Sequence, residues 1–277
     1  MEKELFEVKV NAKLAAYAAD PELMLTENMS GKMTDCKAFT TSCANNTTCQ
    51  KRIDAAINMV KNHSDAAALA LADYLAPSTQ KRHITQKQLI ERLETIGCPV
   101  PVCMFCYAQK SLTGFRGDAL NIKLTANLRY MTACERSAAE LPIITGFRGN
   151  DGLLYERLES HGDTQDAIHA INYVNTVYNN PRVNFTAWTK NPEHWYQAFL
   201  KVGKPKNLKL ILSSYLLNTP DIKAAQYYNS LMPGMIDSVF TVWTENGAKL
   251  NNITLNCCGQ KDAAGRVLSR RCKECMN

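Results

Sequence analysis

The sequence predicts an α/β fold in which a parallel β/α barrel, or part of one, follows an N-terminal and mostly helical extension. From residue 141 onward, short apolar runs alternate with amphipathic segments in units of roughly 25–30 residues, which is typical of parallel sheets. The chain has 277 residues and is 45% apolar, so it is large enough to bury an extensive core. We expect the extension to span residues 1–97 and the barrel to span residues 98–277.

The N-terminal part has a helical pattern. Residues 54–75 predict one helix, broken near residues 62–64, and residues 85–96 predict a second. Thr85 and Gln88 match a capping box at the start of the second helix. A third helix is expected at residues 122–134, with Cys134 in the core, whereas residues 1–35 show no strong period.

The C-terminal part is expected to contain five strands, at residues 153–158, 183–188, 208–212, 238–242 and 253–255. Asp163 is expected to cap the first intervening helix, Asn191 and Pro192 to open the second, and residues 222–231 to form the third. This repetition favours a partial or complete TIM-type barrel with right-handed crossovers over an open doubly wound sheet. No G-x-G-x-x-G motif opens these helices, which disfavours a dinucleotide-binding fold.

Polar residues follow the predicted strands, and in parallel β/α proteins the carboxyl ends of the strands form the reactive face. We expect Glu159, His161, Asp163 and Lys190 to be the candidates for catalysis, with His161 the best for proton transfer. The expected cofactor-binding or substrate-binding residues are Ser160, Gly162, Thr189, Ser213 and Ser214. The alternatives are structural: Asp163 as a helix cap, His161 bonded to backbone, Lys190 as a solvated loop residue and the serines as turn residues.

Arg148 is a further candidate for binding an anion. It lies in one copy of a short repeat, TGFRGD at residues 113–118 and TGFRGN at residues 145–150. Glycines beside an arginine allow the backbone to approach an anion closely, and the apolar run at residues 141–144 places Arg148 after another expected strand. Arg148 or Lys190 is therefore expected to bind a carboxylate or phosphate, unless the repeat is a chance similarity of two turns.

Composition and the N-terminal sequence indicate a cytoplasmic protein without a membrane partner. No stretch approaches the ~20 apolar residues of a membrane span, and residues 1–4 lack the basic-then-apolar order of a signal peptide. The net charge of +6 is mild, and the only dense basic segment, residues 266–273, is explained by a solvated face or by nucleic-acid binding.

Eleven cysteines in a reducing compartment suggest metal binding before disulfides. Two pairs with the spacing C-x-x-C each have further cysteines upstream, and such pairs allow two thiolates to bind one ion. The candidate ligands are Cys49, Cys98, Cys103, Cys106, Cys257, Cys258, Cys272 and Cys275. Thiolates suit zinc and iron–sulfur clusters about equally. The alternatives are that the middle group packs as small apolar residues and that the C-terminal group is a structural zinc knuckle.

Several of these motifs occur in an order that resembles a known family, the phage and gut-bacterial proteins called gene product 88-like. The resemblance covers roughly residue 98 to the C-terminus. The motifs that carry it are CMFCYA at 103–108, RLESHGD at 157–163, WTKN at 188–191, SS at 213–214, FTVW at 240–243, NC at 256–257 and C-x-x-C at 272–275.

This family is distantly similar to radical S-adenosylmethionine proteins, which have an early cysteine triplet followed by a β/α barrel. The similarity implies a [4Fe–4S] cluster on Cys98, Cys103 and Cys106, with the fourth iron open to S-adenosylmethionine. Four residues separate Cys98 from Cys103, where the radical proteins have three, so Cys49 is an alternative ligand to Cys98. Their glycine-rich motif is not evident, unless the turn at Gly162 replaces it.

Three functions follow from these observations. The first is an iron–sulfur enzyme, radical S-adenosylmethionine-like, with one or two clusters and an unknown small-molecule or macromolecular substrate at the mouth of the barrel. The second is a zinc-stabilised phage or bacterial protein that binds nucleic acid or a protein, favoured by a pI of about 8.7. The third is a barrel hydrolase or transferase whose metal is purely structural.

Overall fold

The computed structural model describes residues 3–27, 37–38, 40, 45–105, 117–148, 151–159 and 162–253. The N-terminal half is mainly helical, as expected. Its elements are α1 (Lys3–Ala19), η1 (Pro21–Met24), β1 (Thr26–Glu27), β2 (Lys37–Ala38), α2 (Thr47–Lys61), α3 (Asp65–Leu75), α4 (Gln86–Thr95), η2 (Val102–Phe105), α6 (Gly117–Ala133) and η3 (Ala138–Glu140). None of the helices in the described ranges is long and apolar enough to cross a membrane.

Local capping explains where these helices begin. The break predicted near residues 62–64 is confirmed, because Ser64 caps α3 and its side chain accepts a hydrogen bond from the Ala67 amide. The capping box of Thr85 and Gln88 is also confirmed at α4. Helix α2 begins seven residues before the predicted position at Asp54, because Asn46 serves as its N-cap.

The C-terminal half contains a five-stranded sheet in which four strands are parallel and follow one another in chain order, which confirms the predicted α/β class. The strands are β3 (Phe147–Arg148), β4 (Leu154–Leu158), β5 (Val183–Thr189), β6 (Leu208–Ser213) and β7 (Ser238–Phe240). The helices that follow β4 to β7 are α7 (Ala167–Asn179), α8 (Pro192–Val202), α9 (Ile222–Leu231) and α10 (Glu245–Leu250).

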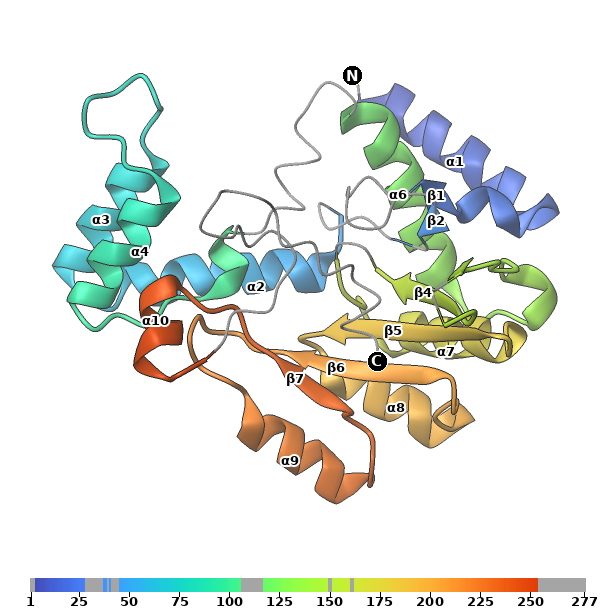
Figure 1. Ribbon diagram of the computed structural model, residues 1–277. Helices are drawn as coiled ribbons and strands as arrows, with labels where there is room; N and C mark the ends of the chain where they lie inside the picture. The colour runs from blue at the N-terminus through green and yellow to red at the C-terminus, as the bar shows by residue number, and fades with distance from the viewer. Residues whose placement is uncertain are drawn as a thin grey trace.

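Figure 1 shows α7, α8 and α9 on one side of the parallel strands, an arrangement compatible with part of a β/α barrel. The strand expected at residues 253–255 is not confirmed. Ile253 lies outside any strand, and residues 254–255 are not described.

Side chains alternate between the two faces of the sheet. Phe185 and Leu210 point to the helix-covered face, where they are buried in one core with Trp195 of α8. On the other face, the guanidinium of Arg157 lies 4.1 Å from the centre of the Trp188 ring. The helix-covered face therefore carries the core, and the other face carries polar and aromatic groups.

The packing runs across the expected boundary between residues 97 and 98. Val10 and Tyr17 of α1 are buried in the same core as the sheet. A second, smaller cluster joins α2, α3 and α4, and it includes Cys98 and Val100 from the following loop. The N-terminal helices therefore pack on the β/α part and help to shape one end of it.

Candidate functional site

Asp163 connects two strand ends at the carboxyl edge of the sheet. Its Oδ1 accepts hydrogen bonds from Thr189 Oγ1 (2.8 Å) and from the Thr164 amide (2.8 Å). Its Oδ2 accepts one from the Lys190 amide (2.7 Å). Asp163 is buried, with 6% of the residue exposed, so these bonds hold the end of β5 against the segment that follows β4.

The prediction that Asp163 caps the first helix of the β/α part is wrong. Asp166 is the N-cap of α7, and its side chain accepts from the His169 amide (2.8 Å). The helix begins three residues later than the sequence pattern indicated, because the oxygens of Asp163 are already bonded to the end of β5. Asp163 thus positions the site, and its carboxylate is fully occupied by hydrogen bonds.

Arg52 of α2 reinforces the same junction. Its guanidinium lies 3.4 Å from Asp163 Oδ2 and also donates to the Lys190 carbonyl oxygen and to Asn191 Oδ1. Asn46 Nδ2 donates to the carbonyl of Asp163 (2.7 Å). The first turns of α2 therefore lie at the carboxyl edge of the sheet, a role for Arg52 that no local pattern in the sequence indicated.

Lys190 and Ser213 follow or end adjacent strands, and the structure brings them together as predicted. Lys190 Nζ donates to Ser213 Oγ over 2.6 Å. Ser214 is directed differently, because its hydroxyl is bonded to Thr241 Oγ1 (2.9 Å) and accepts from the Asp221 amide (3.1 Å). Ser213 is therefore the serine that meets Lys190, and Ser214 stabilises the connections around β7.

Glu159 occupies a strained position immediately after β4. Its φ of 60° is in the left-handed region, which costs a non-glycine residue about 1–3 kcal/mol. Its carboxylate is 5% exposed and accepts a hydrogen bond from the Tyr173 hydroxyl (2.6 Å). Strain of this kind persists only where the surroundings enforce it, so Glu159 remains a strong candidate for function.

His169 lies beside this carboxylate in the core. Its Nδ1 accepts from the Gln165 amide (3.1 Å), so the proton is assigned to Nε2, which lies 3.9 Å from Glu159 Oε1. Burial lowers the pKa of His169 to about 3, with a smaller contribution from His194. His169 is therefore neutral at physiological pH. Nε2 has no hydrogen-bond partner among the described residues.

Two of the predicted site residues, Ser160 and His161, lie outside the described residues. Gly162 adopts a φ of 107°, a conformation that favours glycine at this turn. His194, which sequence reasoning missed, lies at the same edge with its Nδ1 hydrogen-bonded to Thr164 Oγ1 (3.1 Å). Burial lowers the pKa of His194.

Arg148 does not lie at this edge. Strand β3 is antiparallel to β4, and Arg148 pairs with Leu154, the first residue of β4. It is exposed there, and its guanidinium donates to the Gly152 carbonyl (2.8 Å). Arg148 therefore does not join Lys190, because the direction of β3 places it at the opposite end of the sheet, and its expected anion binding stays a prediction.

The loop at residues 98–105, which carries Cys98 and Cys103 and is called the cysteine loop below, is attached to the segment that follows β6. The Val102 amide donates to the Tyr215 carbonyl, and the Leu217 amide donates to the Val100 carbonyl, each over 2.9 Å. Element η2, which carries Cys103, also packs against α2. Burial raises the pKa of Tyr215, and the neighbouring Cys103 raises it further. Cys103 therefore lies at the carboxyl edge.

Cys98 has very different surroundings from Cys103. It is 4% exposed within the apolar cluster of α2, α3 and α4, and its thiol lies 3.5 Å from the Pro99 carbonyl oxygen. Burial raises the pKa of this thiol, which disfavours the thiolate that binds metal. The packing alternative for Cys98 thus agrees with its environment better than the ligand role does.

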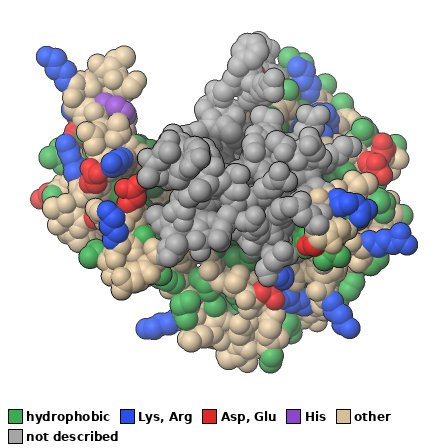
Figure 2. Space-filling view, in the orientation of Figure 1, with side chains coloured by type: hydrophobic (Ala, Val, Ile, Leu, Met, Phe, Trp, Pro, Cys, Tyr) green, Lys and Arg blue, Asp and Glu red, His purple; other side chains and the backbone are tan. Residues whose placement is uncertain are grey.

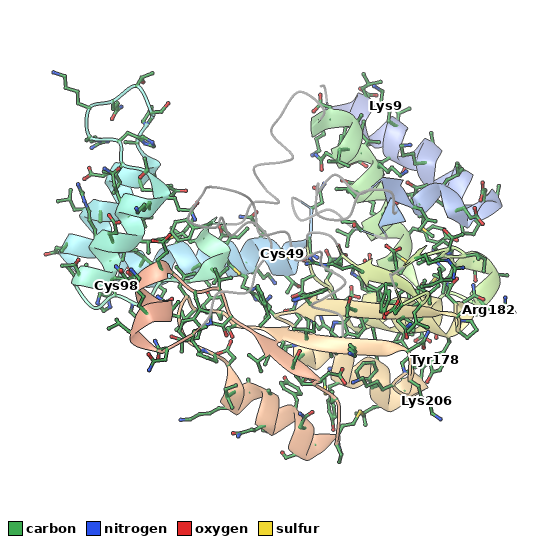
Figure 3. All side chains as sticks on the ribbon, viewed as in Figure 1. Lys9, Cys49, Cys98, Tyr178, Arg182 and Lys206 are labelled. Carbon is green, nitrogen blue, oxygen red and sulfur yellow. The ribbon has the colours of Figure 1, made fainter. Side chains whose placement is uncertain are left out.

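Cys49 is half-buried in the first turn of α2. Figure 3 shows it above the sheet, with Cys98 apart from it below α3 and α4. Cys134, expected in the core, is exposed at the end of α6. Cys106 and the four C-terminal cysteines, Cys257, Cys258, Cys272 and Cys275, lie outside the described residues. Within the described ranges, no three His, Cys, Asp or Glu side chains form a group that could hold a metal ion.

Comparison with known proteins adds no assignment: no protein family, curated protein or solved structure matches this chain. In the view of Figure 2, the Lys and Arg side chains of the described residues are scattered around the periphery of this face. The site is therefore defined by its own geometry, a hydrogen-bonded carboxyl edge beside a cysteine loop.

Proposed function

We propose that the protein is an iron–sulfur enzyme, radical S-adenosylmethionine-like, with its active site at the mouth of a partial β/α barrel. One observation carries the proposal. The backbone hydrogen bonds from Val102 and Leu217 attach the cysteine loop to the end of β6, where Lys190 and Ser213 meet. A metal-binding loop and a set of polar strand ends at one edge are what such an enzyme requires.

The surroundings of the cysteines favour one choice among the proposed ligands. Cys103 and Cys106 supply two thiolates from the loop. Cys49, half-buried on the helix that packs against η2, suits the third position better than Cys98 does. Cys98 lies among apolar side chains that disfavour a thiolate. The C-terminal cysteines are proposed to bind a second cluster or a zinc ion.

The residues of the edge have distinct proposed roles. Cys49, Cys103 and Cys106 would hold a [4Fe–4S] cluster, which would supply one-electron chemistry and bind S-adenosylmethionine. Asp163 and Arg52 hold the backbone of Lys190 from both sides, which orients its ammonium. Glu159, held by Tyr173, is proposed to move a proton at its carboxylate.

Anaerobic purification followed by iron and acid-labile sulfide analysis and a visible spectrum tests this proposal. We expect Cys103→Ser, Cys106→Ser and Cys49→Ser to lose iron, whereas Cys98→Ala keeps it. Cys134→Ser is the matched control, because this thiol is exposed at the end of α6. A colourless protein that contains zinc and no iron would overturn the proposal.

A protein that contains zinc and no iron would favour the alternative, a zinc-stabilised protein that binds nucleic acid or a protein partner. The pI of about 8.7 and the basic segment at residues 266–273 motivate it. A gel shift with nucleic acid across a range of salt concentrations tests it, because binding through phosphates weakens as salt rises. Arg266, Arg270 and Arg271 are the first residues to substitute.

A further inference from the structure

We infer that Lys190 and Ser213 form the binding site for a single carboxylate group of the molecule that occupies the carboxyl edge. This inference rests on the proposed function, since it names the chemistry of the substrate or cofactor at the same site. It is carried by the balance of charge and hydrogen bonds around the Lys190 ammonium.

The ammonium of Lys190 lacks a counter-ion among the described residues. The residue is half-buried, and the hydrogen bond from its Nζ goes to the neutral hydroxyl of Ser213 (2.6 Å). An ammonium has three donors, so this bond leaves donors and a full positive charge for a ligand. Because a partly buried charge is stabilised by a partner of opposite sign, a bound anion complements this position.

The neighbouring charged groups, Asp163 and Arg52, already have hydrogen-bond partners. Asp163 accepts hydrogen bonds from Thr189 Oγ1, the Thr164 amide and the Lys190 amide, and it is paired with Arg52. The guanidinium of Arg52 is in turn bonded to backbone and to Asn191. Asp163 therefore does not neutralise the Lys190 ammonium, and Arg52 is not directed toward a ligand.

The backbone of Lys190 is also fixed on both sides. Its amide donates to Asp163 Oδ2, and its carbonyl accepts from Arg52. The side chain thus starts from a rigid position and reaches across to the next strand. A preorganised ammonium loses less conformational freedom on binding than a solvated surface lysine does.

The arrangement favours a carboxylate over a phosphate. One ammonium and one hydroxyl match the two oxygens of a monoanionic carboxylate. A phosphate monoester carries about 1.5–2 negative charges near pH 7 and needs further cations. Arg52, a second cation at this edge, is already bonded to Asp163, to the Lys190 carbonyl and to Asn191. The site therefore suits a single negative charge.

The test uses the whole protein as purified and measures its urea unfolding midpoint in potassium acetate, potassium phosphate and potassium chloride at equal ionic strength. A ligand that binds only the folded state raises the midpoint. We expect acetate to raise it relative to chloride in the wild type, and this shift to disappear in Lys190→Met. Lys206→Met is the matched control, because this exposed lysine lies at the opposite end of the sheet (Figure 3) and should keep the full acetate shift.

An acetate shift that is unchanged in Lys190→Met would overturn the inference, and so would a phosphate shift that exceeds the acetate shift and depends on Lys190. Should Lys190→Met fail to fold, Ser213→Ala decides the question by the same criterion, and Lys190→Arg should retain the shift. Iron content separates this inference from the proposed function. Iron loss through the cysteine variants tests the cluster, whereas the acetate shift tests Lys190 and does not depend on metal.

Discussion

Replacing Glu156 by glutamine should stabilise the protein, and the gain should grow with pH. Glu156 lies on the helix-facing side of β4 in register with Phe185, and it is 1% exposed. Its Oε1 has no hydrogen-bond partner in the part of the chain that the structure describes. Burial raises the pKa of this carboxyl from 4.5 to about 8, although a hydrogen bond from the Arg157 backbone opposes the rise.

The direction of this pH dependence follows from the protons that the folded and unfolded states bind. The unfolded chain releases the Glu156 proton above pH 4.5, whereas the folded protein keeps it until about pH 8. The free energy of unfolding therefore falls as the pH rises through this interval. Each pKa unit corresponds to about 1.4 kcal/mol, so at pH 7 the penalty amounts to about 3 kcal/mol, and near pH 5 it is below about 1 kcal/mol. Glutamine is neutral throughout and removes this penalty.

Urea unfolding of the wild type and of Glu156→Gln, measured from weakly acidic to weakly alkaline pH, checks the prediction. The two free energies should converge near the acidic end and diverge steadily as the pH rises. Glu91→Gln on α4 is the control for the exchange of a glutamate for glutamine, because the Glu91 side chain is 53% exposed whereas Glu156 is buried. Parallel curves for Glu156→Gln and the wild type would show that Glu156 ionises normally and would refute the reasoning.

Three further predictions concern other buried groups. His169, whose pKa burial lowers from 6.5 to about 3, stays neutral in the folded protein while the unfolded chain takes up a proton, so stability is lost as the pH falls below 6.5. Between pH 4.5 and 6.5 this slope opposes that of Glu156, and urea unfolding of Glu156→Gln should therefore reveal an acid-side loss that the wild type hides. Asp163→Asn should lower the free energy of unfolding by about 3 kcal/mol, since it leaves Arg52 without its carboxylate partner; an unchanged unfolding midpoint would contradict the positioning role of Asp163. Cys98→Ala should cost about 1 kcal/mol through lost packing and leave the metal content unchanged, and loss of iron in this variant would restore Cys98 as a ligand.

The secondary structure of the β/α part was largely predictable because its signals are local. The strand at 183–188 and the helix after Pro192 depend on residues that are neighbours in the chain, as does the capping box at Thr85. The cap assigned to Asp163 failed for the opposite reason. Its partners, Thr189 and the Lys190 amide, are 26 and 27 residues away, and a carboxylate that suits a local cap suits a distant donor equally well.

The positions of two arginines, Arg148 and Arg52, depend on strand direction and on contacts between distant residues, which the sequence pattern does not show. Arg148 was placed at the wrong end of the sheet because hydrophobic pattern does not show whether a short strand runs parallel or antiparallel to its neighbour. Arg52 was missed because its contacts with Asp163 and Lys190 join residues more than a hundred positions apart. The local sequence of a helix does not distinguish an arginine on the surface from an arginine that contacts the site.

Hydrophobic periodicity was sufficient to predict the parallel α/β fold, and the polar residues after the strands predicted the edge at which Lys190 and Ser213 meet. The sequence pattern does not give the environment of each cysteine. Cys98 and Cys103 lie in one loop, yet Cys98 is buried in an apolar cluster and Cys103 lies beside Tyr215 at the edge. The environment of a thiol is set by segments that reach it from elsewhere in the chain, here α2 to α4 on one side and the end of β6 on the other. Folding therefore distinguishes two cysteines that spacing alone treats as equivalent.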